Sequence, residues 1–385
     1  MIQPLRIAML THSTNPRGGV VHAMQLSEAL TALGHEVTLH APDAKGSGFF
    51  RKPACRTACV AVGAAAPDMT AMVEQRIDEY VRYFEQDGTR DFDIFHAHDG
   101  ISGNALATLK ERGLIPAFVR TVHHIDHFAD PRLMELQDRS IEWADAFLAV
   151  SAVWQAALRE GRGLESTVVG NGVDTQRFAP AWSGEQAALH DRIGLHAGPV
   201  FLSIGGIEAR KNTLGILDAF RQLRAVKPDA QLVIAGGVSL LDHRDYQEEF
   251  HSHLRALRED ASAVHIIGAV PDDDMPNLYR IADALVFPSL KEGFGLVVLE
   301  AMASGVPAIV PAMAPFTEYL GSDDAIWCDP RHSASIAEAM VLSLVPQLRN
   351  RIIPRGLDVA GRFSWHRVAE THLSTYTNLR EAAHA

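Results

Sequence analysis

Short apolar runs alternate with longer amphipathic stretches along the first half of the chain. The stretch 69–84 has the period of a helix, because its apolar side chains recur every three or four residues. The short runs have the length and composition of buried strands. The strands predicted in this half are residues 5–10, 35–40, 92–96, 117–122, 146–150 and 167–169.

The same alternation begins again after a polar segment, 174–198, which follows the strong turn signal Asn171-Gly172. Strands that alternate with helices form parallel sheets that are covered on both faces. The pattern therefore predicts an α/β protein with two doubly wound lobes, divided near residues 175–198. The strands predicted in the second lobe are residues 200–204, 231–235, 265–267, 284–287 and 308–310.

Length and composition agree with two ordered lobes and exclude several other classes of protein. The chain has 385 residues, more than the ~250–300 at which single hydrophobic cores stop growing. Apolar residues make up 47% and charged residues 21%, which excludes disordered, collagen-like and coiled-coil proteins. The formal net charge of −12 argues against nucleic-acid partners, because these need a basic surface.

Apolar runs and cysteines bear on the location of the protein. The first apolar run, 7–10, is too short for a signal peptide, and no later run reaches the ~20 residues of a membrane span. Stable membrane insertion is therefore not expected. Cys55, Cys59 and Cys328 have neither the number nor the spacing of a disulfide framework or a zinc motif. We interpret them as reduced thiols, which predicts a cytoplasmic protein.

The first candidate for ligand chemistry is the polar turn 11–17, which leads into Gly18 and Gly19 at the start of a helix. Bare backbone amides and the positive end of the helix dipole suit an anion. The alternative is a tight turn that needs a positive φ. A dinucleotide site is disfavoured, because the spacing is not G-x-G-x-x-G and the second strand, predicted to end at His40, lacks an acidic residue at its tip.

The second candidate is the loop between the strand 284–287 and the next helix. Gly293 and Gly295 again place backbone amides at a helix start. Glu292 and Glu300 flank this loop, where their carboxylates would repel a phosphate but accept hydrogen bonds from neutral hydroxyls. Such a loop suits a ligand with a charged middle and hydroxylated ends. The alternatives are a solvated charge for Glu292 and a helix-dipole interaction for Glu300.

Glu292 and Glu300 are also the ends of an E-x7-E motif, within E-G-F-G-L-V-V-L-E-A-M-A-S-G-V-P. This stretch resembles the signature of retaining GT-B glycosyltransferases of the family-4 type, the glycosyl transferases group 1. The opening T-H-S-T-N-P-R-G-G-V-V-H further resembles a little-characterised subgroup encoded beside nitrilase and radical-SAM genes. Other segments similar to the family, in consistent order, are Gly18-Gly19, 171–180, 201–212 and Phe363-Ser364-Trp365.

The resemblance implies a GT-B fold, in which two Rossmann-like domains face each other across a cleft. Residues 1–175 would form the acceptor-side domain and residues 199–364 the donor domain, with 176–198 as a linker. A C-terminal helix, 365–385, would return toward the N-terminal domain. The ligand implied is a nucleotide-diphosphate sugar, bound mainly by the donor domain.

The resemblance also implies roles for particular residues of the donor domain. Lys211 would neutralise the leaving diphosphate, Glu292 would hold hexose hydroxyls, and Glu300 would hold the ribose hydroxyls. The remaining donor contacts would come largely from backbone groups. These belong to Phe294, Gly295 and Leu296 at the helix start, and to Gly268 and Val270 near the base.

In the N-terminal domain, the family pattern places Gly18 and Gly19 beside the phosphates. It also implies that His123 lines the sugar near its reactive carbon, with the neighbouring His124 as the alternative by one position. Without the resemblance, a lone His at the end of a strand would be interpreted as structural.

One position departs from the family pattern. The family has G-R at the start of the second lobe, whereas this chain has Gly205-Gly206. A cation that stabilises the leaving diphosphate usually contributes strongly to catalysis. We expect Arg210 or Arg17 to supply the missing charge. The alternatives are low activity or an unusual donor.

The chemistry implied is retaining, metal-independent transfer of a hexosyl group from a UDP-, GDP- or ADP-sugar, with a UDP-sugar favoured. The acceptor would be a small molecule or lipid-linked, no cofactor is expected, and the protein would be a monomer or a homodimer. Two alternatives stay open. One is a nucleotide-sugar epimerase or hydrolase on the same fold. The other, suggested by Gly206, is a non-catalytic nucleotide-sugar binding partner.

Four weaker signals remain. The D-x-D at 91–93 precedes a strand, and the acidic run 272–274 is typical of a helix start, so neither favours a metal site. The H-A-H-D at 96–99, which includes His96 and His98, could line an acceptor site or be structural. The basic and aromatic loop 46–53 could bind an acceptor, contact a membrane surface or pack as an ordinary loop.

Overall fold

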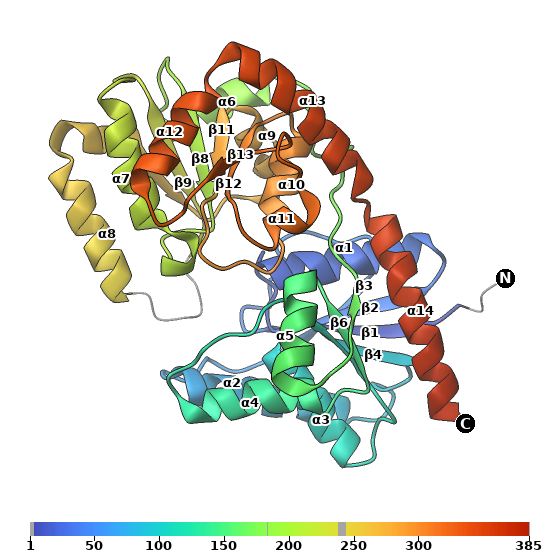
Figure 1. The fold of residues 1–385 in the computed structure, drawn as a ribbon. Helices are drawn as coiled ribbons and strands as arrows, with labels where there is room; N and C mark the ends of the chain where they lie inside the picture. The colour runs from blue at the N-terminus through green and yellow to red at the C-terminus, as the bar shows by residue number, and fades with distance from the viewer. Residues whose placement is uncertain (1–3, 183, 238–243, 385) are drawn as a thin grey trace. The chain divides into compact units, whose positions relative to one another are not determined.

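The computed structural model describes residues 4–182, 184–237 and 244–384, which form two compact α/β units (Figure 1). Unit 1 consists of Met1–Gly172 and Trp365–Ala385, and unit 2 of Val173–Ser364. The segment predicted as a linker, 176–198, therefore belongs to unit 2, where it contains the helix α6.

Unit 1 is built on a parallel sheet. In the described residues this sheet has seven strands, in the order β3-β2-β1-β4-β5-β6-β7. The chain adds strands outward from β1 on one side and from β4 on the other, so the switch point, where such sheets bind ligands, lies between these two strands. The strands are β1 (Arg6–Leu10), β2 (Glu36–Asp43), β3 (Arg56–Ala61), β4 (Ile94–Ala97), β5 (Val119–Val122), β6 (Ala146–Ala149) and β7 (Thr167–Val168).

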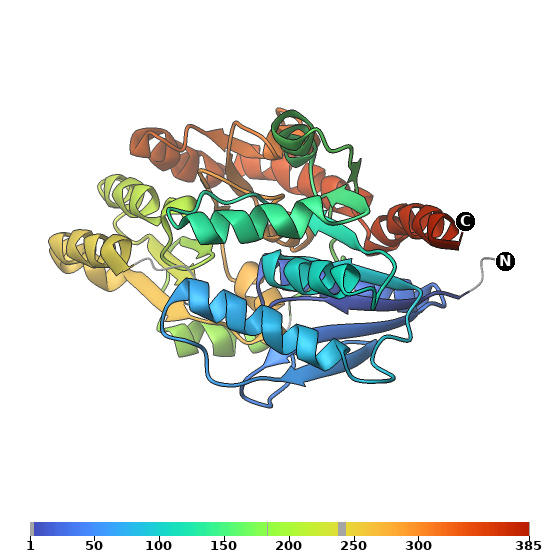
Figure 2. The same cartoon turned by 90° about the horizontal axis from the view of Figure 1, so that it is seen from below.

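Helices cover both faces of this sheet, which explains why β1 is largely apolar and why β4 and β5 are buried along their whole length. Helices α2, α3 and α4 lie side by side on one face, and α1 lies on the other face in contact with α14 (Figures 1 and 2). The helices are α1 (Gly18–Ala32), α2 (Met69–Phe84), α3 (Gly100–Glu111), α4 (Pro131–Glu142), α5 (Ala152–Arg162) and α14 (Trp365–His384).

Unit 2 repeats the architecture with a second parallel sheet. In the described part of the chain this sheet has six strands, in the order β10-β9-β8-β11-β12-β13, and its switch point lies between β8 and β11. The strands are β8 (Val200–Ile204), β9 (Gln231–Ala235), β10 (Val264–Gly268), β11 (Ala284–Val286), β12 (Ala308–Pro311) and β13 (Ile326–Cys328).

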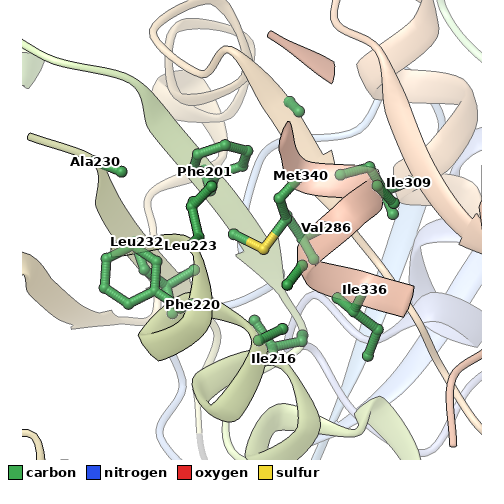
Figure 3. Close-up of a cluster of buried hydrophobic side chains, with 14 of the residues drawn as sticks. Phe201, Ile216, Phe220, Leu223, Ala230, Leu232, Val286, Ile309, Ile336 and Met340 are labelled. Atoms are coloured by element: carbon green, nitrogen blue, oxygen red, sulfur yellow. The ribbon is translucent and has the colours of Figure 1, made fainter. Parts of the chain in front are cut away.

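One face of this sheet packs against α7 and α12, and large apolar side chains fill the space between them (Figure 3). Phe201 and Leu232 from the strands meet Phe220 from α7 and Met340 from α12, and each of them is fully buried. The helices are α6 (Glu185–Ile193), α7 (Thr213–Arg224), α8 (Arg244–Ala256), α9 (Met275–Arg280), α10 (Leu296–Ala303), α11 (Phe316–Tyr319), α12 (Ser333–Ser343) and α13 (Pro346–Arg362), with the short 3-10 helices η1 (Ala209–Lys211), η2 (Arg258–Ala263) and η3 (Asp272–Asp274).

Two strands have no counterpart in the sequence prediction, and both lie at the edge of a sheet. Strand β3 is largely exposed, and its short apolar run, A-C-V-A, consists mostly of small residues. Strand β13 has only three residues, I-W-C, and is too short to be recognised by its pattern. Edge strands need less apolar surface than central strands, which explains why they were missed.

The second strand is longer than predicted. It continues past His40 to Asp43, so the prediction that no acidic residue lies at its tip is wrong. The Asp43 carboxylate accepts hydrogen bonds from the backbone amides of Lys45, Gly46 and Gly48 at 3.1, 2.9 and 2.7 Å. Its oxygens therefore stabilise the following turn, which is a structural role.

The basic and aromatic loop 46–53 packs onto unit 1. Arg51 donates two hydrogen bonds to the Glu28 carboxylate on α1, at 2.6 and 2.7 Å. The Phe50 amide donates to the Thr14 carbonyl at 3.0 Å. These contacts favour ordinary packing over membrane contact. Among the helices of the described residues, none combines the length and the apolar character that crossing a membrane requires.

Candidate functional site

Two cations share one carboxylate oxygen at the switch point of unit 2. Oε1 of Glu292 lies 2.5 Å from Nζ of Lys211 and 2.6 Å from Nη1 of Arg210. Lys211 and Arg210 belong to η1, after β8, and Glu292 lies in the loop after the adjacent strand β11. The structure therefore brings together three residues that the sequence had singled out separately.

Burial makes this cluster electrostatically strong. The side chains of Lys211 and Glu292 are only 12% and 9% exposed. Burial lowers the pKa of Lys211, and the Glu292 carboxylate opposes that shift. The Lys211 ammonium also lies 4.4 Å from the centre of the Phe287 ring. Charges in such surroundings are weakly screened, so an incoming anion would interact strongly with Lys211, while Arg210, whose side chain is 35% exposed, remains open to solvent.

The turn after β8 explains the departure at Gly206. Gly206 has φ +76°, and a Cβ atom there would lie 3.0 Å from the Gly237 carbonyl oxygen. A Cβ on Gly205 would lie 2.7 Å from Cε of Lys211, so the glycine leaves room for the lysine side chain. This backbone disfavours an arginine at position 206, and the structure places Arg210 beside Lys211 instead. Arg17 lies in unit 1, directly before α1.

Glu300 lies on α10 and is held by a residue that no sequence motif indicates. The hydroxyl of Tyr279, on α9, donates a hydrogen bond of 2.6 Å to Oε2 of Glu300. Burial raises the pKa of Glu300, and the hydrogen bond from Tyr279 opposes that shift. Tyr279 is fully buried. Its sequence context, N-L-Y-R-I-A-D, carries no motif that would have identified it.

The start of α10 depends on the glycine of E-G-F-G. Gly295 has φ +99°, and a Cβ atom there would lie 2.7 Å from Cε1 of Phe316. Phe294 stacks on Tyr319 with ring centres 4.7 Å apart, and the Tyr319 hydroxyl donates to the Phe294 carbonyl at 3.2 Å. Leu296 is the first residue of the helix. The amides of a helix's first turn lack partners within the helix, so they are suited to ligand oxygens.

The segment predicted to meet the base lies close to the same turn. Gly268 ends β10, with φ +65°, and its carbonyl accepts a hydrogen bond from the Gly236 amide at 2.7 Å. Gly237 lies close to Ala269, and Gly206 lies close to Gly237. The segment that leads to the half-buried Val270 thus borders the turn that carries Lys211.

In unit 1 the structure brings Gly19 and His123 together. A Cβ atom on Gly19 would lie 3.3 Å from Cδ2 of His123, so the glycine lets α1 approach the imidazole closely. His124 is directed elsewhere, with Nε2 at 2.9 Å from the Asp126 carboxylate. Of the two histidines, it is therefore His123 that lies beside Gly19. Gly18 makes no comparable close approach, since a Cβ atom there would meet nothing within 4 Å.

His123 belongs to a cluster of imidazoles that the sequence did not predict. Neighbouring rings in the cluster have centres between 4.2 and 5.9 Å apart. Burial lowers the pKa of each, to about 4 for His22 and about 3 for His372, so the cluster is neutral at pH 7. The five residues, which come from α1, β4, the ends of β4 and β5, and α14, are His22, His96, His98, His123 and His372.

The H-A-H-D segment is divided between two roles. His96 is fully buried and bonded to the Tyr376 hydroxyl and the Thr121 hydroxyl, both at 2.7 Å, which is a structural arrangement. Asp99 caps α3 by accepting the Ser102 amide at 2.8 Å. His98 instead contacts His123.

The two acidic motifs have structural partners. Asp93 accepts hydrogen bonds from the backbone and side chain of Arg6, which also forms an ion pair with Asp91. The acidic run 272–274 forms η3, directly before α9, as the helix-start interpretation predicted. Within residues 4–182, 184–237 and 244–384, no group of three or more His, Cys, Asp or Glu side chains has the arrangement of a metal site.

Two protein-family models match the chain. "Glycosyltransferase Family 4" matches residues 16–177, and "Glycosyl transferases group 1" matches residues 187–357. The O-antigen chain mannosyltransferase B of Escherichia coli is 33% identical over 179 residues, which are 46% of this chain and 45% of that protein. The match therefore spans less than half of that relative's length.

Other similarities extend over nearly the whole chain. The phosphatidyl-myo-inositol mannosyltransferase of Mycobacterium leprae is 26% identical over 381 residues, covering 97% of this chain and 96% of the relative. A crystal structure of Anabaena Alr3699/HepE in complex with UDP and glucose has a TM-score of 0.77 at 17% identity, covering 97% of this chain and 99% of that one. The latter similarity concerns the fold.

Because its imidazoles are buried, we expect the folded protein to lose stability in acid. Their folded pKa values lie below the ~6.5 of an unfolded His, so the unfolded chain binds more protons, and stability is lost as the pH falls from about 6.5 toward 4. The melting temperature should therefore drop between pH 7 and pH 5. His372→Gln should reduce that drop, by the equivalent of roughly 1–2 kcal/mol.

The matched control is His251→Gln, because His251 is exposed on α8. Thermal melts of the three proteins at both pH values make the comparison. If the melting temperature fell equally in all three, the buried imidazole of His372 would not be a source of the acid sensitivity.

Proposed function

Because the chain belongs to the glycosyltransferases of the family-4 type and has their α/β GT-B fold, as the resemblance implied, we propose that it is a retaining hexosyltransferase that uses a nucleotide-diphosphate sugar without a metal ion. The observation that carries the proposal is the shared oxygen of Glu292, which holds Lys211 and Arg210 side by side. Two adjacent cations could pair with the two negatively charged phosphate groups of a diphosphate.

The cation pair would act on the leaving group. When the bond between the sugar and the diphosphate breaks, negative charge grows on the diphosphate, and fixed cations nearby stabilise that charge. Lys211 is buried and held by Glu292, so little reorganisation is needed during the reaction. Arg210 supplies the second charge that Gly206 lacks, and this argues against a non-catalytic binding protein. These two cations would take the part that a metal ion takes in other transferases.

The hydroxylated ends of the donor would meet carboxylates. Glu300, half-buried and bonded to Tyr279, would accept hydrogen bonds from the ribose, and Glu292 would accept them from the hexose. The UDP and glucose in the Anabaena structure support a UDP-sugar as the first donor to test, followed by GDP- and ADP-sugars.

Retention would follow from transfer on one face of the sugar. The bond between C1 and the phosphate oxygen breaks, the bond between C1 and the acceptor oxygen forms, and the acceptor proton passes to the departing diphosphate. Holding both reactants close supplies much of the rate. An α-linked donor should therefore give an α-linked product. The anomeric NMR couplings of the product check this, and a β-linked product would refute retention.

Removal of the cations tests the proposed role directly. We expect Lys211→Met to lower kcat/KM by about 10²–10³-fold, since it removes a group that stabilises the leaving diphosphate. Arg210→Ala should also lower it, whereas Lys227→Met, an exposed lysine of unit 2, should not. Release of nucleoside diphosphate, with chelator present, is measured for a donor first selected by a thermal-shift screen of nucleoside diphosphates and their sugars.

The same release of nucleoside diphosphate is measured for Arg17→Ala, because Arg17 is the other arginine that could supply the second charge. If Arg210→Ala and Arg17→Ala both kept wild-type turnover, neither arginine would supply the second charge. Sugar release that does not depend on any acceptor would favour the hydrolase alternative.

A further inference from the structure

His98 and His123 form a direct contact inside unit 1. Nδ1 of His98 lies 3.1 Å from Nε2 of His123, at hydrogen-bond distance. The two residues follow β4 and β5, which are neighbours in the sheet, so the parallel pairing fixes their relative position. His98 is 3% exposed, whereas His123 is partly exposed. An inner imidazole therefore contacts an outer one.

The other nitrogen of His98 decides which ring carries the shared proton. Nε2 of His98 lies 2.8 Å from Sδ of Met9. A thioether sulfur has no proton and can only accept, so Nε2 of His98 is the protonated nitrogen. A neutral imidazole has a single N–H, which leaves Nδ1 of His98 as an acceptor. His123 must then donate from Nε2, and its own Nδ1 keeps the lone pair.

The rest of the cluster has other partners. His96 is bonded on both nitrogens, to Tyr376 and Thr121. His22 directs Nδ1 at the side-chain oxygen of Asn171, at 2.6 Å. His372 directs Nδ1 at the carbonyl of Val368, at 2.7 Å. These contacts leave His98 as the imidazole that fixes the proton of His123.

We propose that His98 is a positioning residue, which holds His123 as the Nε2–H tautomer so that Nδ1 of His123 accepts a hydrogen bond from a sugar hydroxyl. The inference rests on the proposed function, because it needs a sugar at His123. The hydrogen bond to His98 fixes both the orientation of the ring and the nitrogen that is offered as an acceptor. A ring in the other tautomer would present an N–H there and favour a different hydroxyl geometry.

Two variants of similar shape separate positioning from packing. The Oδ1 of an asparagine can take the place of Nδ1 of His98 as an acceptor, whereas leucine offers only methyl groups. We expect His98→Leu to lower kcat by roughly 10–100-fold through loss of alignment, with little change in KM for the donor, and His98→Asn to restore most of kcat. Equal kcat values for His98→Leu and the wild-type enzyme would overturn the proposal.

The tautomer itself is measured by NMR on protein labelled with ¹⁵N in the His rings, with His123→Gln to assign the signals. The wild-type protein should show His123 protonated at Nε2, and His98→Leu should give a mixture of tautomers. Protonation of His123 at Nδ1 in the wild-type protein would refute the proposal even if His98→Leu failed to fold. This measurement needs no turnover, so its outcome is separate from that of the glycosyltransferase proposal.

Discussion

The contact of Lys211 and Arg210 with one oxygen of Glu292 organises the candidate site of unit 2. A glycine at 205 leaves room for the lysine, and the Leu290 amide donates to the Arg210 carbonyl at 2.9 Å, which ties η1 to the loop that carries Glu292. Buried ion pairs contribute little net stability, because desolvation offsets their attraction. Such a cluster is better explained by a ligand that uses the cations than by the stability of the fold.

The two units offer complementary chemistry. Unit 2 presents a pair of cations and two carboxylates, which suit a diphosphate and its hydroxylated ends. Unit 1 presents the neutral imidazole of the partly exposed His123, which suits a hydroxyl group. The net charge of −12 describes the whole surface and not these clusters. Overall charge alone would have given no indication of the cation cluster that we propose as a diphosphate site.

Local patterns predicted the central elements well, and long-range contacts explain the rest. Helix α2 and strands β8 and β9 have the predicted ends, since their patterns are purely local. Of the candidate site, Lys211, Glu292 and Arg210 were each singled out in the sequence, and the structure brings them together. The contacts of Tyr279 with Glu300 and of His98 with His123 could not be predicted, because these partners are 21 and 25 residues apart and only the fold brings them together.

The central claim is that Lys211 binds the diphosphate of the donor. Isothermal titration of the nucleoside diphosphate selected by the thermal-shift screen, compared with its parent nucleoside, measures the contribution of the phosphates to binding. The account predicts that the wild-type protein prefers the diphosphate by at least about tenfold, which is about 1.4 kcal/mol, and that Lys211→Met loses most of this preference while it retains its affinity for the nucleoside. An unchanged preference in Lys211→Met would contradict the account.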